Sequence, residues 1–252
     1  MDVRIIPCLQ LLENGLVKTT RFTSPNYIGD PLNTVRIFNE LEVDELCFLD
    51  IRATLHGEEP DYDLLQHITE ECFMPLSYGG GISNMENAGK VFRCGFEKII
   101  INSALFKTPE LIQQLSAHYG SQAIIVAIDV KKSLLGNYTV MSHSGTKNTG
   151  KDAVAWAQEI TDRGAGEILL TSINNEGTWR GFDVPLIKKV SDAVTIPVIA
   201  HGGAGSEHHI NAVIESTGAG AVAVGSMFLY QKKDMGVLIN FPKDRIEAAC
   251  HS

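Results

Sequence analysis

Two residues at the ends of matching apolar segments could share acid/base chemistry. The segment "RIIPCLQ" (residues 4–10) ends in Gln10, and "AIIVAID" (residues 123–129) ends in Asp129. Two carboxylates that face each other can divide general acid and general base work, because their surroundings can set different pKa values. An amide forms hydrogen bonds but does not exchange protons at a useful pKa, so Gln10 leaves one half of such a pair unfilled. Asp129 alone could also be a helix N-cap or a loop-anchoring acid.

Clusters of small residues end four other apolar segments, two in each half of the chain. They are Gly79-Gly80-Gly81, Asn102-Ser103, Gly202-Gly203 and Gly225-Ser226. Glycine lets a backbone approach a ligand closely, and helix N-termini attract anions. One Gly-Gly pair would indicate only a tight turn, but matched clusters in both halves predict two phosphate sites and a bisphosphate that bridges them.

The elements that position these residues alternate along the chain. Short apolar segments, most of them rich in β-branched residues, show little alternation, which is typical of parallel strands buried on both faces. Amphipathic segments lie between them. Asp30 and Pro31 open one predicted helix, and Ser83 with Glu86 has the spacing of a capping box before another. This order predicts an α/β fold, either a parallel barrel or a doubly wound sheet.

An internal repeat decides between the two folds. Gln10 matches Asp129, and "DELCFLDI" matches "AGEILLTSI", so that Asp50 matches Thr171. The offset stays close to half the chain. Two such (βα)4 halves, about residues 1–120 and 121–252, predict one (β/α)8 TIM barrel domain over residues 1–252. In such a barrel the chemistry lies at the C-terminal ends of the strands.

Composition narrows the classes of partner. The net charge of −9 without a basic cluster argues against nucleic acid, and no apolar run is long enough to span a membrane. The N-terminus does not read as a signal peptide. The odd number of cysteines indicates reduced thiols in the cytoplasm; they are Cys8, Cys47, Cys72, Cys94 and Cys250. No spacing indicates a metal site, and we expect no cofactor.

Several of these motifs together resemble the cyclase subunit of imidazole glycerol phosphate synthase. They are "RIIPCL", "VDELCFLDI", "YGGGI", "KIIINSA", "GSQAIIVAID", "GAGEILLTSI" and "PVIAHGGAG", and the resemblance covers about residues 4–230. It implies a heterodimer with a glutaminase, a class I glutamine amidotransferase, docked on the N-terminal face of the barrel. Ammonia would cross the barrel and react with phosphoribulosyl-formimino-aminoimidazole carboxamide ribonucleotide. The products would be imidazole glycerol phosphate and aminoimidazole carboxamide ribonucleotide.

The resemblance also implies roles for individual residues. Asp129 matches one catalytic aspartate, Gln10 stands at the position of the other, and Lys18 matches a lysine in a flexible loop. The substrate and phosphate residues would be Asp50, Gly81, Asn102, Ser103, Thr171, Gly202, Gly203, Gly225 and Ser226. The gate where ammonia enters would be Arg4, Glu45, Lys98 and Glu167.

The departures from the family pattern gather at the expected mouth. Besides Gln10, the segment "SINNEGT" puts Asn174 and Glu176 where the family usually has aspartates, and His201 stands where it usually has serine. His201 could replace the lost base or tune the second phosphate site. The tail "GSMFLYQKKDMGVLINFP" resembles a paralogous branch that occurs with bacterial surface-polysaccharide genes.

Three functions stay open at this point. The first is an ammonia-dependent cyclase, weakened by Gln10. The second is an ammonia conduit and scaffold that feeds a sugar amidotransferase in the synthesis of acetamidino sugars for lipopolysaccharide O-antigen. The third is a sugar-phosphate isomerase built from the same half-barrel repeat.

Overall fold

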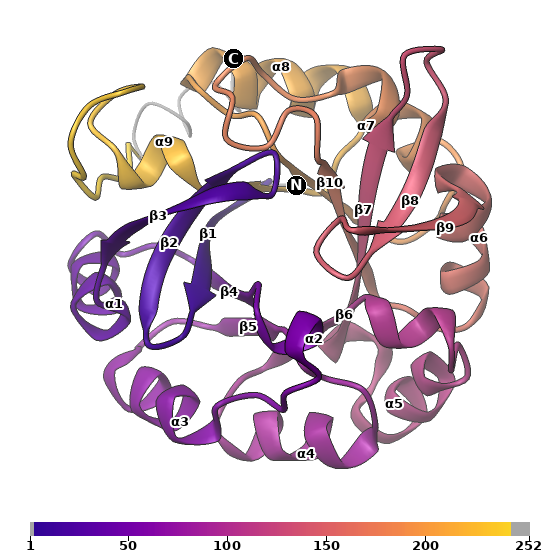
Figure 1. Ribbon diagram of the computed structural model, residues 1–252, viewed down its shortest axis with the longest axis horizontal. Coiled ribbons are helices and arrows are strands. Elements are labelled where there is room, and N and C mark those ends of the chain that lie inside the picture. The colour runs from indigo at the N-terminus through magenta and orange to yellow at the C-terminus, as the bar shows by residue number, and fades with distance from the viewer. Residues whose placement is uncertain (1–2, 243–252) are drawn as a thin grey trace.

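Eight parallel strands pair edge to edge and close into a barrel in the computed structural model, which describes residues 3–242. Strand β12 pairs with β1 and strand β7 pairs with β10, so the ring has no open edge (Figure 1). In order around the ring the strands are β1 (Arg4–Leu12), β4 (Leu46–Asp50), β5 (Leu76–Gly79), β6 (Lys98–Ile101), β7 (Ile124–Lys132), β10 (Glu167–Ser172), β11 (Val198–His201) and β12 (Ala221–Val224). The predicted (β/α)8 barrel is confirmed.

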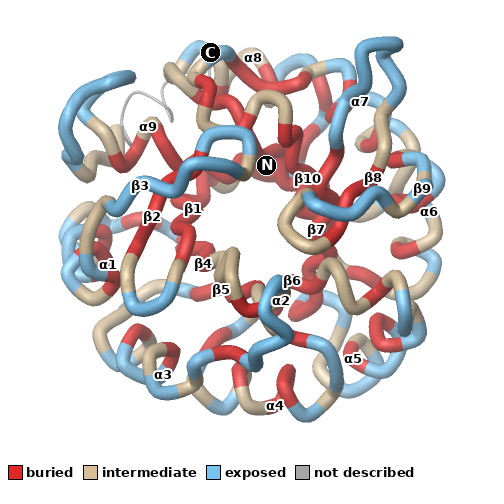
Figure 2. Tube along the Cα trace, in the orientation of Figure 1, coloured by how far each residue is buried: buried red, intermediate tan, exposed pale blue. Residues whose placement is uncertain are grey.

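Helices surround the ring and bury the outer faces of the strands. They are α1 (Pro31–Glu40), α3 (Tyr62–Glu71), α4 (Met85–Arg93), α5 (Leu111–Tyr119), α6 (Ala153–Asp162), α7 (Val184–Ser191) and α8 (Glu207–Thr217), with the short α2 (Ala53–His56), α9 (Ser226–Leu229), η1 (Ser103–Phe106) and η2 (Ser121–Ala123). The main core lies between strands and helices and includes the buried Phe38, Phe48 and Trp156. Figure 2 shows this as a buried ring of strands inside helices with exposed outer faces.

Two antiparallel hairpins extend the sheet at the C-terminal end of the ring (Figure 1). Strands β2 (Gly15–Thr20) and β3 (Thr23–Gly29) follow β1, and β8 (Tyr138–Ser142) and β9 (Lys147–Asp152) follow β7. The sequence had predicted only a loop around Lys18, and that prediction is wrong. Because β2 pairs directly with β1, Lys18 is held on a regular strand beside Gln10.

The predicted helix starts are right in one case and wrong in the other. Asp30 caps α1 and accepts a hydrogen bond from the backbone N–H of Asn33 at 2.9 Å, with Pro31 in the first turn. Helix α4 is capped by Asn84, which accepts from the N–H of Asn87 at 2.8 Å. The cap is therefore Asn84, one residue after the predicted Ser83, because asparagine is an equally good cap.

The two halves proposed from the repeat contribute four barrel strands each. Residues 1–2 and 243–252, at the outer ends of those halves, lie outside the described residues, and so does Cys250. The other four cysteines are free thiols. Within residues 3–242 no helix combines the length and apolar character needed to cross a membrane.

Candidate active site at the mouth of the barrel

The two-residue period of β1 sends every second side chain into the lumen. Ile6 and Cys8 belong to a small apolar cluster that fills the lumen, whereas Leu9 packs in the outer core. Arg4 and Gln10 continue the inward series at the two ends of the strand. Successive residues of a strand point to opposite faces, so these four side chains share the inner face. The inner face of β1 is therefore polar at both ends and apolar between them.

A cavity of about 690 Å³ opens at the C-terminal ends of the strands. The predicted site residues that line it are Gln10, Asp50, Gly81, Asn102, Ser103, Asp129 and Thr171, together with His201. Lys107 also lines this cavity, as do Arg52 and His143. The mouth therefore combines candidate acid/base groups with two cations, Arg52 and Lys107, that suit a phosphorylated ligand.

Asp129 is the titratable group best suited to acid/base work in this cavity. Its Oδ2 accepts a hydrogen bond from Asn102 Nδ2 at 2.7 Å. Burial raises the pKa of Asp129 to about 6, although hydrogen bonds from Thr171 and Asn102 oppose the rise. A carboxyl group with a pKa near neutrality can both take and give a proton.

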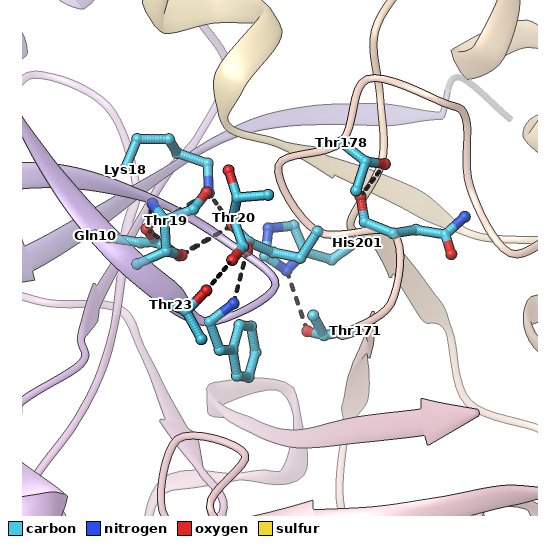
Figure 3. Close-up of polar contacts among 11 residues, drawn as sticks. Gln10, Lys18, Thr19, Thr20, Thr23, Thr171, Thr178 and His201 are labelled. Atoms are coloured by element: carbon cyan, nitrogen blue, oxygen red, sulfur yellow. Dashed lines mark hydrogen bonds and ion pairs between the residues drawn. The ribbon is translucent and has the colours of Figure 1, made fainter. Parts of the chain in front are cut away.

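His201 lies two strands from Asp129 in the ring, with Thr171 between them in register. Its Nδ1 is 3.1 Å from the Thr171 hydroxyl oxygen, a contact drawn in Figure 3. Burial lowers the pKa of His201, but the neighbouring Cys8 and Glu176 raise it, and the net pKa lies above that of an exposed histidine. The Thr171 hydroxyl thus lies between two titratable groups, and His201 is a second candidate for proton exchange at the mouth.

Lys18 does not project freely from a loop. It is buried, and its ammonium group forms an ion pair with the buried Glu176 on the segment after β10. Thr19 donates to Gln10 Oε1 through its backbone N–H at 3.0 Å, and its hydroxyl oxygen lies 3.1 Å from the same atom. Figure 3 shows Gln10, Lys18 and Thr19 gathered on one side of the mouth. The predicted catalytic residues Gln10 and Lys18 are therefore brought together, and both contact Glu176.

The predicted phosphate residues of the first half lie close together. Gly81, Asn102 and Ser103 all line the cavity, and Ser103 Oγ accepts a hydrogen bond from the backbone N–H of His143 at 2.8 Å. Asp50 instead holds its own loop, because its Oδ1 accepts from the N–H groups of Arg52 and Ala53. Burial raises the pKa of Asp50.

The predicted residues of the second half are arranged differently. Ser226 lines a separate cavity of about 580 Å³ with Lys18, whereas Gly202, Gly203 and Gly225 lie in the walls of neither cavity. Gly203 instead accepts a backbone hydrogen bond from Gly181 at 2.8 Å. In this structure these glycines allow close packing of chain segments. Their role toward a phosphate stays a prediction.

The four predicted gate residues form a closed ring of ion pairs at the opposite end of the barrel. Arg4 contacts Glu45 at 2.8 Å and Glu167 at 2.7 Å. Lys98 contacts Glu167 at 3.0 Å and Glu45 at 3.4 Å. Each charge has two opposite neighbours, and the lumen cluster lies between this ring and the mouth.

Several site residues escaped the sequence analysis. Glu176 was noted only as a departure, and Thr19 and His143 were not considered at all. Lys107 follows Ser103 by one helical turn, which is a signal that could have identified it. No local pattern predicts that Thr19 meets Glu176, because the two lie on separate segments joined only by the fold. The described part of the chain holds no group of three or more His, Cys, Asp or Glu suited to a metal ion.

Comparisons with known proteins find relatives along nearly the whole chain. A family model described as histidine biosynthesis protein matches residues 4–234. A protein of Leptospira borgpetersenii, provisionally named imidazole glycerol phosphate synthase subunit HisF, is 48% identical over 95% of this chain and 94% of its own length. A protein of Pseudomonas aeruginosa, provisionally named subunit hisF2 of the same synthase, is 45% identical over 95% of both chains. A protein of Vibrio vulnificus, provisionally named hisF3, is 43% identical over 95% of this chain and 92% of its own.

Proposed function

The chain belongs to the histidine biosynthesis protein family, and we propose that it is the cyclase-type barrel subunit of a glutamine-dependent complex like imidazole glycerol phosphate synthase. A glutaminase partner would dock on the N-terminal face as a heterodimer and release ammonia into the barrel. At the mouth, phosphoribulosyl-formimino-aminoimidazole carboxamide ribonucleotide would be cyclised and cleaved to imidazole glycerol phosphate and aminoimidazole carboxamide ribonucleotide.

One observation carries this proposal: a purely apolar cluster lies along the barrel axis between a ring of charges and a titratable carboxyl group. The ring of Arg4, Glu45, Lys98 and Glu167 lies at one end, and Asp129 lies at the other. Neutral ammonia can cross an apolar lumen, whereas a charged ammonium ion would lose its hydration at high cost. Such a barrel would deliver neutral ammonia, the reactive form, to Asp129, the proposed acid/base residue.

The residues at the mouth divide the remaining work. Asp129 exchanges protons with the reacting substrate, and Asn102 fixes its orientation through Oδ2. Lys107 and the Ser103 region would hold one phosphate of the substrate. Gln10 offers an amide that orients substrate through hydrogen bonds without moving a proton.

The test measures conversion of the bisphosphate with saturating ammonium, which removes any need for the partner. We expect turnover by the wild type and a loss of about 10²–10⁴-fold in Asp129→Asn, the usual contribution of a general acid/base group. Asp129→Asn turnover equal to the wild type would remove Asp129 from the mechanism. No wild-type turnover, together with active glutamine hydrolysis in the complex, would favour the second candidate below.

A second candidate function is an ammonia conduit for a sugar amidotransferase docked at the mouth, in the synthesis of acetamidino sugars for lipopolysaccharide. The observation that favours it is the contact between Gln10, Lys18 and Glu176. Two of the three predicted catalytic side chains are engaged with one another, and one of them cannot exchange protons. Both candidate functions are cytoplasmic.

A further inference from the structure

The carboxylate of Glu176 is surrounded by donors from the other side of the mouth. Its Oε1 pairs with the ammonium group of Lys18, accepts from the Thr19 hydroxyl at 3.0 Å, and lies 3.5 Å from Gln10 Nε2. Its Oε2 accepts from the backbone N–H of Phe22 at 3.0 Å. Glu176 is 1% exposed and Lys18 is 6% exposed. The charges of this pair are therefore satisfied within the chain.

Backbone contacts lock the same two segments together. The N–H of Arg21 donates to the carbonyl oxygen of Glu176 at 2.9 Å, and Arg21 Nε donates to the carbonyl oxygen of Asn174 at 3.2 Å. Gly177 lies so close to the hairpin that a Cβ there would be 2.4 Å from the Thr19 carbonyl oxygen. The turn between β2 and β3 is thus docked on the segment after β10.

Gln10 suits this contact because it is an amide. Its Oε1 accepts from Thr19 while its Nε2 faces Glu176. A carboxylate at position 10 would lose the donor and place a second negative charge beside Glu176. Two carboxylates at such a distance cannot both ionise without cost. The contact therefore accommodates one anion, and Gln10 and Glu176 are a matched pair.

Lys18, which pairs with Glu176, lies next to Gly225 and Ser226, which belong to the predicted phosphate site of the second half. The Cε of Lys18 would be 3.1 Å from a Cβ at Gly225, and Lys18 lines the second cavity with Ser226. A buried ammonium group needs an anion next to it. Here Glu176 supplies that anion from within the chain, at the position where a ligand phosphate could pair with Lys18.

We propose that Glu176 is a built-in anion that holds Lys18 and the β2–β3 hairpin closed over the mouth independently of a phosphorylated ligand, with Gln10 as the neutral partner that this requires. Glu176 is then a positioning residue that acts through Lys18, and a ligand phosphate must compete with it. This inference rests on the proposed function in taking the mouth as the ligand site. Its test reads hairpin closure and not turnover, so the two can fail separately.

The experiment measures hydrogen–deuterium exchange in peptides that cover residues 15–29. We expect these amides to be protected in the ligand-free wild type and to exchange about 10- to 100-fold faster in Glu176→Gln, because a buried charge loses its partner. Glu13→Gln is the matched control, since Glu13 precedes the same hairpin but pairs at the surface with Arg52. It should exchange like the wild type.

Inorganic phosphate then tests whether Glu176 stands in for an anion. In Glu176→Gln, added phosphate should restore protection of the hairpin, whereas sodium chloride of equal ionic strength should not. In the wild type, phosphate should change little. Equal protection in Glu176→Gln and wild type would overturn the proposal, and so would opening of the hairpin that phosphate does not reverse.

A charge-swap pair tests the part assigned to Gln10 and guards against misfolding of the first variant. Gln10→Glu alone should open the hairpin, because two carboxylates then meet. The double variant Gln10→Glu/Glu176→Gln restores a single anion at the contact and should recover protection relative to either single variant. If the effects of the two single changes on the exchange rate simply add in the double variant, Gln10 and Glu176 do not depend on each other, and the part assigned to Gln10 is wrong.

Discussion

The raised pKa that suits Asp129 to acid/base chemistry also lowers the free energy of unfolding near neutral pH. Burial raises its pKa to about 6, so the fold favours the protonated form. As pH rises from about 4, the unfolded chain loses this proton first, while the folded chain keeps it until near pH 6. The free energy of unfolding therefore falls across this interval. A shift of this size corresponds to roughly 3 kcal/mol lost by pH 7.

Asp129→Asn removes this pH dependence. Relative to the wild type, the variant should gain up to about 3 kcal/mol in free energy of unfolding between pH 4 and pH 7, because asparagine does not titrate. Urea denaturation of both proteins at the two pH values measures the difference. A constant difference between variant and wild type would mean that Asp129 has an ordinary pKa in the folded protein.

At the scale of elements, the segments after β10 and β11 pack closely against each other at Gly181 and Gly203. Gly203 has a φ of +113°, and a Cβ there would lie 2.1 Å from the Gly181 carbonyl oxygen. Gly218, at the end of α8, has a φ of +70° with no atom within 4 Å of such a Cβ. The two glycines share a left-handed conformation but differ in the space around them.

Alanine substitutions separate these two causes. Gly218→Ala should cost about 1–2 kcal/mol of unfolding free energy, the cost of a left-handed backbone with a side chain. Gly203→Ala adds a clash with the backbone and should cost about 1–3 kcal/mol more. Equilibrium urea unfolding compares them, and equal costs would show that the Gly203 segment moves aside freely.

The barrel strands could be predicted from the sequence pattern, whereas the hairpin strands could not. Segments such as "KIIIN" and "EILLTS" are continuous apolar runs, since both faces are buried, and this predicted every barrel strand. Strand β3 is "TSPNYIG" and mostly exposed, so it lacks a hydrophobic pattern of either period. The hairpin exists because β2 can pair with β1, a tertiary condition that local propensity does not contain.

The candidate site shows the same division. Asp129 and Gln10 were predictable because each ends one copy of a repeated segment. The partner of Lys18 was not, because Glu176 reaches it only when the hairpin folds across the barrel mouth. For this reason the substitutions at positions 10 and 176 looked independent in the sequence, although the two side chains lie in contact.

At the scale of the whole molecule, the ring of Arg4, Glu45, Lys98 and Glu167 makes a prediction about coupling to the partner. Lys98→Met leaves Glu45 and Glu167 with Arg4 as their remaining cation in the ring. In the complex with the glutaminase, glutamine-driven turnover should fall about tenfold, which corresponds to near 1.4 kcal/mol. Ammonium-driven turnover should stay unchanged, because ammonium reaches the mouth from solution.

A lysine on an outer helix, away from the ring of charges, is the matched control. Lys90 lies on α4, where it pairs with Glu86 of the same helix and with Glu59, and Lys90→Met should leave both turnover rates unchanged. If Lys98→Met lowers the two rates equally, the ring contributes to folding or to the mouth itself, and it has no part in passing ammonia.

Strand β1 runs unbroken from the ring to the mouth. Arg4 lies at its first residue and Gln10 near its end, and β12, β4 and β2 are hydrogen-bonded along it. Its partners change along its length, from β12 at residues 4–7 to β4 at residues 8–11 and β2 at residues 10–12. The end that carries the ring of charges and the end that pairs with the hairpin therefore belong to one continuous strand, so a change in the position of Arg4 and a change in the position of Gln10 are changes in the same element.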